Sequence, residues 1–174
     1  MFKLGRMFCF SIPVVALMIL LVLMSACERT TVKGEENKAM VRRVQDLWNT
    51  GNLTSADEIF AIDFVNHDPV SPDVRDLKTY KESITTVRTG FPDFHVSIDD
   101  MLAEGDKVAV RWTATGTHTG VLIGIPPTEM QATWSGMTIY RLAAGKIVEV
   151  WWSKDMFSLL IQLGVIPPPG QAME

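Results

Sequence analysis

The chain has little cysteine and little histidine, and this scarcity limits the chemistry that it can carry. Its 174 residues include two cysteines, Cys9 and Cys27, and three histidines. Everything after Cys27 therefore lacks a thiol for a disulfide, a metal or nucleophilic attack. The histidines are scattered and form neither His-x-His nor His-Glu-x-x-His, the spacings of common metal sites. We therefore expect no metal site.

The N-terminus has the layout of a targeting segment. Lys3 and Arg6 supply positive charge, and residues 7–23 contain no charged side chain. Small residues then precede a cysteine in the run Met24-Ser25-Ala26-Cys27. This order is typical of a secretory signal, and a cysteine directly after the small residues resembles the bacterial lipobox. That resemblance implies a diacylglyceryl group on the Cys27 thiol and cleavage before this residue.

We therefore predict a signal peptide over residues 1–26, a lipidated N-terminus with a short tether over 27–34, and an exported protein anchored to a bacterial membrane. Glu28 follows the cysteine where Asp would retain the protein at the inner membrane, which favours the outer membrane in a bacterium with two membranes. The alternative is an uncleaved membrane-spanning helix. The uncharged run of 17 residues is shorter than the ~20 that such a helix needs.

Positive charge is scarce throughout the chain. The sequence has 16 Lys and Arg residues against 20 Asp and Glu residues, a net charge of −4. Loss of Lys3 and Arg6 with a signal peptide would make the remaining chain more acidic still. This balance argues against nucleic acid as a partner.

Hydrophobic periodicity predicts helices first and strands second. Helical spacing indicates helices over 35–49 and 73–89, and Ser55 and Glu58 suggest a capping box for a short helix between them. Residues 64–69 are expected to turn before Pro69. Alternation with a period of two then indicates four strands, over residues 94–99, 107–118, 131–142 and 146–153. A short helix capped by Asp155 is expected after them.

This order of elements implies an α+β domain over residues 35–166, followed by a Pro-rich tail over 167–174. Helices that precede hairpin-linked strands indicate a mostly antiparallel sheet. We expect a curved, cone-shaped sheet, with about three N-terminal helices across its concave face and a short C-terminal helix. The cavity inside such a cone is the natural site for a small ligand.

A series of short motifs makes the comparison with a family specific. In chain order they are Gly90-Phe91-Pro92-Asp93, Glu104-Gly105-Asp106-Lys107-Val108, Arg111-Trp112, Gly116-Thr117-His118-Thr119-Gly120, Gly124-Ile125-Pro126-Pro127-Thr128 and Gly145-Lys146-Ile147-Val148-Glu149. Together they resemble the SnoaL-like polyketide cyclases, or ester cyclases, over about residues 40–164. The resemblance implies the cone fold of nuclear-transport-factor-two-like proteins, a homodimer, and no metal or organic cofactor.

The resemblance also implies an activity, which is aldol ring closure on an aromatic polyketide ester. In the family, an aspartate on the last strand is the general acid/base. Its column falls on Trp152, and a family histidine on the preceding strand falls on Thr138. The family's asparagine matches Asn66, and a further family aspartate matches Asp155. Replacement of the catalytic aspartate by Trp152 favours ligand binding over cyclisation.

The candidate pocket residues are aromatic and polar. Trp152 should face the cavity, and Trp112 and Trp134 should add aromatic rings to its wall. Asn66 would donate a hydrogen bond to a ligand carbonyl. The full set is Asn66, Trp112, His118, Trp134, Thr138 and Trp152. Some of these candidates, and His67 beside Asn66, have a structural alternative: Trp152 could be ordinary core, Asn66 and His67 turn residues, and His118 an anchor for the loop after its strand.

Two functions remain open from the sequence, together with a purely structural role as a dimer. The first is a binding module for a small apolar ligand that is aromatic or contains a carbonyl group. The second is a cofactor-independent cyclase, isomerase or hydrolase. In such an enzyme, Asp155 or His67 would be the general acid/base residue, although Asp155 could equally be only a helix cap.

Overall fold

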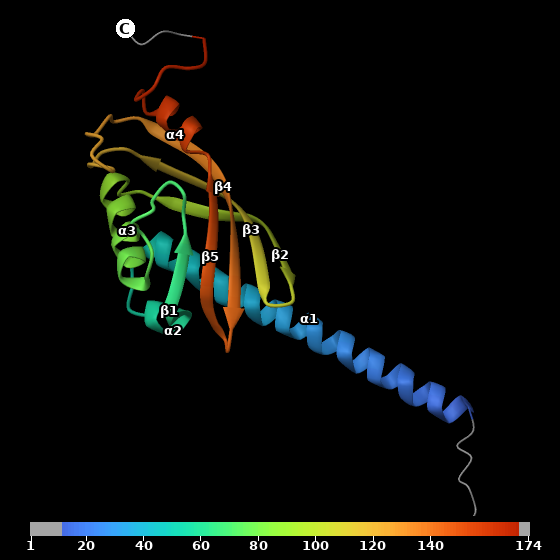
Figure 1. The fold of residues 1–174 in the computed structure, drawn as a ribbon. Helices are drawn as coiled ribbons and strands as arrows, with labels where there is room; N and C mark the ends of the chain where they lie inside the picture. Colours follow the sequence, from blue (N-terminus) through green and yellow to red (C-terminus); the bar gives the residue numbers. More distant parts are fainter. Residues whose placement is uncertain (1–11, 171–174) are drawn as a thin grey trace, which may run out of the picture. The chain divides into compact units, whose positions relative to one another are not determined.

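The computed structural model describes residues 12–170, and the chain divides into two compact units, Met1–Lys33 and Gly34–Glu174 (Figure 1). Helix α1 spans Ile12–Thr50 and contains the helix predicted for residues 35–49. Of the predicted signal peptide, residues 1–11 lie outside the described part, as does the Cys27 side chain. Among the described helices, none has both the length and the apolar character needed to cross a membrane.

The second unit is built on a five-stranded sheet. Its strands are β1 (Phe60–His67), β2 (His95–Glu104), β3 (Lys107–Thr117), β4 (Gln131–Ala143) and β5 (Lys146–Lys154), in the order β1-β5-β4-β3-β2. Every neighbouring pair is antiparallel except β1 and β5, which are parallel. The sheet is curved, with α3 beside β1 (Figure 1). The predicted α+β fold with a mostly antiparallel sheet is confirmed.

Within the described residues, three helices complete the domain besides α1. They are α2 (Ala56–Ile59), α3 (Leu77–Gly90) and α4 (Met156–Gln162). The core forms where apolar residues of α1 and α3 meet the inner face of the sheet: Val41, Val44 and Leu47 from α1, and Tyr80 and Ile84 from α3.

The end of α1 is fixed to its neighbours by polar contacts. Gly51 has a φ of +70°, a conformation that favours glycine, and ends the helix. The Arg88 guanidinium donates hydrogen bonds to the last carbonyls of α1, at 3.0 Å to Trp48 and 2.7 Å to Asn49. The Asn49 amide in turn pairs with both backbone groups of Val96 on β2, at 2.7 and 3.0 Å. These contacts fix the position of Trp48, which faces the cavity described below.

Three predictions about the first half of the domain are wrong. Ser55 directly precedes α2, but its side chain makes no capping hydrogen bond. A capping box instead joins Asp76 and Thr79, so α3 begins at Leu77 and not at Asp73. Residues 64–67, predicted as part of a turn, belong to strand β1. An irregularity between Phe60 and Val65 disturbs the period of two that would have indicated this strand.

Candidate functional site

A cavity of about 430 Å³ lies between the inner face of the sheet and helices α1 and α3. This volume is within the range of small-molecule sites. Its wall is rich in aromatic and aliphatic side chains and draws on helices, loops and all five strands. The aromatic residues are Trp48, Tyr80, Phe91, Phe94, Trp112, Trp134, Tyr140 and Trp152.

Trp152 lies at the centre of this aromatic wall. Its indole Nε1 donates a 2.8 Å hydrogen bond to Asn66 Oδ1. The rings of Trp48 and Trp112 contact it edge to face, with centroids 6.1 and 6.2 Å away. Trp152 is the residue that the sequence comparison predicted at the column of the family's catalytic carboxylate, and its indole lines the cavity.

Asn66 lines the cavity, as the sequence predicted, and its amide is partly engaged by the protein. Nδ2 donates to the Val74 carbonyl at 2.7 Å, and Oδ1 accepts from Trp152. One N–H of the amide is left for a ligand, because a carboxamide has two. Asn66 therefore joins Trp152 to the loop that precedes α3.

Trp112 lies over β4 because its partner there is a glycine. Trp112 and Gly136 are paired in register. A Cβ on Gly136 would lie 2.3 Å from Trp112 Cζ2, so any other residue would displace the ring. Trp112 Nε1 donates to Thr138 Oγ1 at 2.9 Å. Thr138 is therefore a buried support for a cavity residue and does not itself line the cavity.

Two tyrosines add hydroxyl groups to the cavity. Burial raises the pKa of Tyr80 and of Tyr140 above the usual value for a phenol, so both stay neutral at physiological pH. The Tyr80 hydroxyl accepts a 3.0 Å hydrogen bond from Trp48 Nε1. These phenols can act as hydrogen-bond donors, but not as bases.

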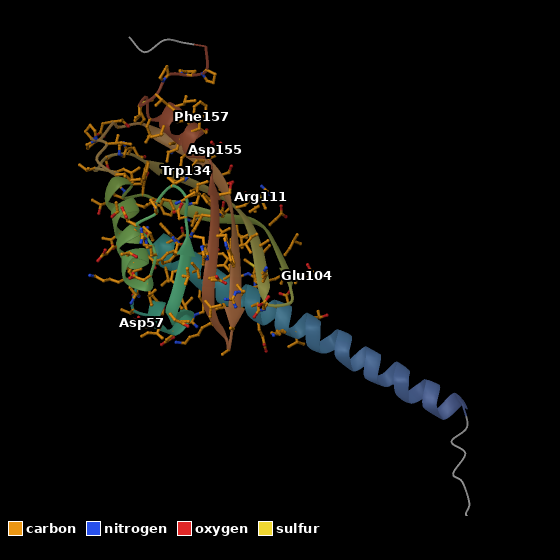
Figure 2. All side chains as sticks on the ribbon, in the orientation of Figure 1. Asp57, Glu104, Arg111, Trp134, Asp155 and Phe157 are labelled. Atoms are coloured by element: carbon orange, nitrogen blue, oxygen red, sulfur yellow. The ribbon has the colours of Figure 1, made fainter. Side chains whose placement is uncertain are left out.

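The two acid/base candidates from the sequence lie away from the cavity. His67 faces outward from β1, where its ring stacks on Trp151 with centroids 5.1 Å apart and lies 3.3 Å from Glu149 Oε1. Asp155 lies at the start of α4 (Figure 2), and its Oδ1 accepts from the Ser158 backbone N–H at 2.9 Å. The capping prediction for Asp155 is therefore confirmed, and neither residue lines the cavity.

His118 also lies outside the cavity lining, although it was predicted as a pocket residue. It is fully buried, and its Nδ1 is 3.1 Å from Thr128 Oγ1. Its backbone carbonyl accepts hydrogen bonds from Thr128 and Glu129, and its N–H donates to Met130. This pattern supports the structural alternative, in which His118 orders the loop between β3 and β4.

Trp134 lines the cavity from β4, as predicted. Its ring contacts Phe91 and Phe94, with centroids 5.1 and 5.9 Å away. The structure therefore brings Asn66, Trp112, Trp134 and Trp152 together around one cavity.

Sequence reasoning missed four charged residues that line the same cavity, Asp68, Asp73, Glu82 and Lys154. Asp68 follows β1 and is only 8% exposed, and Lys154 ends β5. The two side chains form an ion pair. Asp68 was taken for part of a turn, whereas Lys154 lies two residues beyond Trp152 and so on the same face of the strand. That alternation was a signal from which Lys154 could have been found.

The outer face of the sheet is partly apolar. Val65, Met137 and Ile139 are each at least 40% exposed there. Beside them, Arg141 donates to Glu149 at 2.5 Å, and this contact, together with His67, lowers the pKa of the Glu149 carboxyl. The homodimer expected from the sequence would pair on this face, and it stays a prediction. Among the side chains that the structure describes, in residues 31–170, no group of three or more His, Cys, Asp or Glu is arranged to hold a metal ion.

Comparisons with known proteins extend over most of the second unit. A family model for SnoaL-like polyketide cyclases matches residues 38–163. Aklanonic acid methyl ester cyclase DnrD of Streptomyces peucetius is 23% identical over 128 residues, which cover 72% of this chain and 88% of the cyclase.

Solved structures show the same fold. AclR of Streptomyces galilaeus, assigned as a hydroxylase, matches with a TM-score of 0.68 and 29% identity over 78% of this chain and 85% of its own. IdmH of Streptomyces antibioticus, assigned as a polyketide cyclase, matches with a TM-score of 0.67 and 29% identity over 74% of this chain and 99% of its own. These proteins are assigned different reactions, so the chemistry must be argued from the site and not from the fold.

Proposed function

Because the chain belongs to the family of SnoaL-like polyketide cyclases, we propose that its domain binds a small apolar ligand, aromatic or carbonyl-containing, in the cavity. The observation that carries the proposal is the position of Trp152. By the family resemblance Trp152 falls on the column of the catalytic carboxylate, and its indole is held by Asn66, Trp48 and Trp112. The site thus replaces an acid/base group with a flat apolar surface, which suits an aromatic ligand.

The apolar surface that a ligand buries in the cavity sets the expected affinity. Each 100 Å² of apolar ligand surface that leaves water contributes roughly 2.5 kcal/mol. After the entropic cost of association, a bicyclic aromatic ligand should bind with a dissociation constant in roughly the micromolar to millimolar range. Titrations should cover this range.

A second function is supported by family membership and by carboxylates in the cavity wall. A cofactor-independent cyclase, isomerase or hydrolase would need a base at the cavity. Asp155 and His67 lie elsewhere, but the carboxylates of Asp68, Asp73 and Glu82 line the cavity. Turnover of an aromatic ketone or ester during the titrations described next would favour this second function.

Ligand binding should depend on Trp152 and not on its neighbour Trp151, which faces outward beside His67. We expect aromatic ketones and esters to quench the tryptophan fluorescence of the full chain saturably. Trp152→Ala should weaken binding by about tenfold or more, because it removes the central wall of the cavity. Trp151→Ala removes the same chromophore from the outer face and should leave the affinity unchanged. Equal affinities in both variants, or no saturable quenching, would contradict the proposal.

We also propose that a lipid on Cys27 anchors the protein to a bacterial membrane after export, at the outer membrane where two membranes are present. The proposal is supported by the sequence order of residues 1–27 and by Glu28 after the cysteine. An anchored domain would meet ligands outside the cytoplasm, whereas polyketide tailoring takes place inside the cell. This location also favours binding over biosynthesis.

The anchor predicts a different outcome for each of the two cysteines. Cys27→Ala should accumulate at the mass of the uncleaved chain and incorporate no labelled fatty acid. Cys9→Ala, which lies within the predicted signal, should be cleaved and labelled as the original chain is. Gel mobility and metabolic labelling measure both outcomes. A Cys27→Ala protein that is still cleaved and labelled would refute the anchor.

A further inference from the structure

We propose that Lys154 and Asp68 form a subsite for one neutral carbonyl oxygen of the ligand, with the Lys154 ammonium as the hydrogen-bond donor. This inference rests on the proposed function, because it needs a ligand in the cavity. It adds to that function the group that the ligand must carry and the residues that recognise it. Neither residue belongs to the columns that the family resemblance assigns to catalysis.

The pair lies in the cavity wall beside Trp152. Lys154 Nζ is 5.3 Å from the centroid of the Trp152 ring, and both residues line the cavity. Asp68 accepts hydrogen bonds from Lys154 and, at 3.0 Å, from the Val70 backbone N–H. Next to the Trp152 ring the pair supplies a polar group, and a few polar groups placed in a mainly apolar wall are the usual means by which a site orients a ligand.

The Lys154 ammonium has donor capacity left for a ligand. An ammonium carries three N–H donors. Within the described residues, Asp68 is the hydrogen-bond acceptor that contacts it. The lysine side chain is 20% exposed and the Asp68 side chain 5% exposed, so the aspartate is enclosed while the lysine reaches toward open space. A carbonyl oxygen that lies over Trp152 would supply the missing acceptor.

The charge of the pair selects a neutral ligand. Lys154 and Asp68 together carry no net charge, so a carboxylate ligand would be repelled by Asp68 about as much as Lys154 attracts it. A hydrocarbon would displace water from the ammonium and leave its N–H groups without acceptors. A ketone or ester avoids both costs, and a hydrogen bond from a charged donor should favour it by about tenfold or more in affinity.

Three ligands that share one ring system test this selection: 2-acetonaphthone, 2-ethylnaphthalene and 2-naphthoate, titrated calorimetrically into the full chain. We expect the ketone to bind about tenfold more tightly than the hydrocarbon or the carboxylate. In the double variant Asp68→Leu/Lys154→Met, the ketone and the hydrocarbon should bind within about twofold of each other. The hydrocarbon should bind at least as tightly as it does to the original chain, because the variant has no ammonium that the hydrocarbon would strip of water.

A matched control comes from a second lysine–aspartate pair outside the cavity. Lys81 and Asp57 form an ion pair at 2.8 Å, and neither lines the cavity. Asp57→Leu/Lys81→Met should therefore keep the tenfold preference for the ketone. Circular dichroism of both double variants shows whether each is folded.

The possible outcomes separate this inference from the function on which it rests. If the original chain binds ketone and hydrocarbon equally, the subsite is refuted without any variant. If the preference survives in Asp68→Leu/Lys154→Met, the subsite is also refuted. If the original chain binds none of the three ligands, the proposed function itself fails. Loss of the preference in that variant alone, with hydrocarbon binding retained, supports the subsite.

Discussion

Replacing Lys154 with methionine is expected to lower the free energy of unfolding by about 3 kcal/mol. The substitution keeps the length of the side chain but leaves the Asp68 carboxylate, 8% exposed, without its counter-ion. Breaking a buried ion pair from one side typically costs ~3–5 kcal/mol, and the 20% exposure of Lys154 places this pair at the lower end. Urea-induced unfolding followed by circular dichroism measures the loss.

The double variant Asp68→Leu/Lys154→Met is the control for this prediction. It removes both charges, so no uncompensated carboxylate remains in the cavity wall. Replacement of an ion pair by apolar residues of similar volume is often nearly neutral, and we expect stability within about 1 kcal/mol of the original chain. Val70 is 43% exposed, so water can take over the hydrogen bond that its N–H made to Asp68. If the single and double variants lose the same stability, the charges are not coupled.

The second half of the fold could be predicted from the sequence because its signals are local. Strands β3 and β4 alternate regularly and pair with their neighbours in the chain. The alternation placed Val108, Val110 and Trp112 on one side of β3, and the structure buries all three. Strand β1 gave no such signal. It pairs with β5, more than 80 residues away in the chain, and its register shifts between Phe60 and Val65.

The residues of the candidate site also fall into those that could be predicted from the sequence and those that could not. Trp112, Trp134 and Trp152 could be found from alternation and from the family motifs, and all three line the cavity. The Asp68–Lys154 contact joins residues 86 positions apart and exists only because β1 lies beside β5. No local pattern contains that information.

The placement of His67 depended on the same unseen strand. Within β1, side chains alternate between the two faces of the sheet. Phe64 and Asn66 are buried, so Val65 and His67 face outward. Without the strand, Asn66 and His67 could both be assigned to the mouth of the cavity. With it, only Asn66 contacts Trp152, and His67 stacks on Trp151 instead.

Gly136→Ala is expected to lower the free energy of unfolding by about 2–3 kcal/mol and to weaken ligand binding as well. The added methyl group would lie 2.3 Å from Trp112 Cζ2 and 2.6 Å from the Ser153 carbonyl oxygen, so the indole must move. Movement of Trp112 breaks its 2.9 Å hydrogen bond to Thr138 and its edge-to-face contact with Trp152. Overpacking of this kind typically costs ~1–3 kcal/mol.

A glycine-to-alanine substitution elsewhere in the chain should change the free energy of unfolding in the opposite direction. Gly34 lies in α1, where an added Cβ would meet Ala103 Cβ at an ordinary 3.6 Å. Because alanine favours a helix over glycine by ~1 kcal/mol, Gly34→Ala should raise stability slightly and leave binding unchanged. Urea unfolding and the 2-acetonaphthone titration measure both variants. If Gly136→Ala matched the original chain in stability and affinity, the position of Trp112 would not depend on the glycine beneath it, and the cavity wall would be more adaptable than its close packing implies.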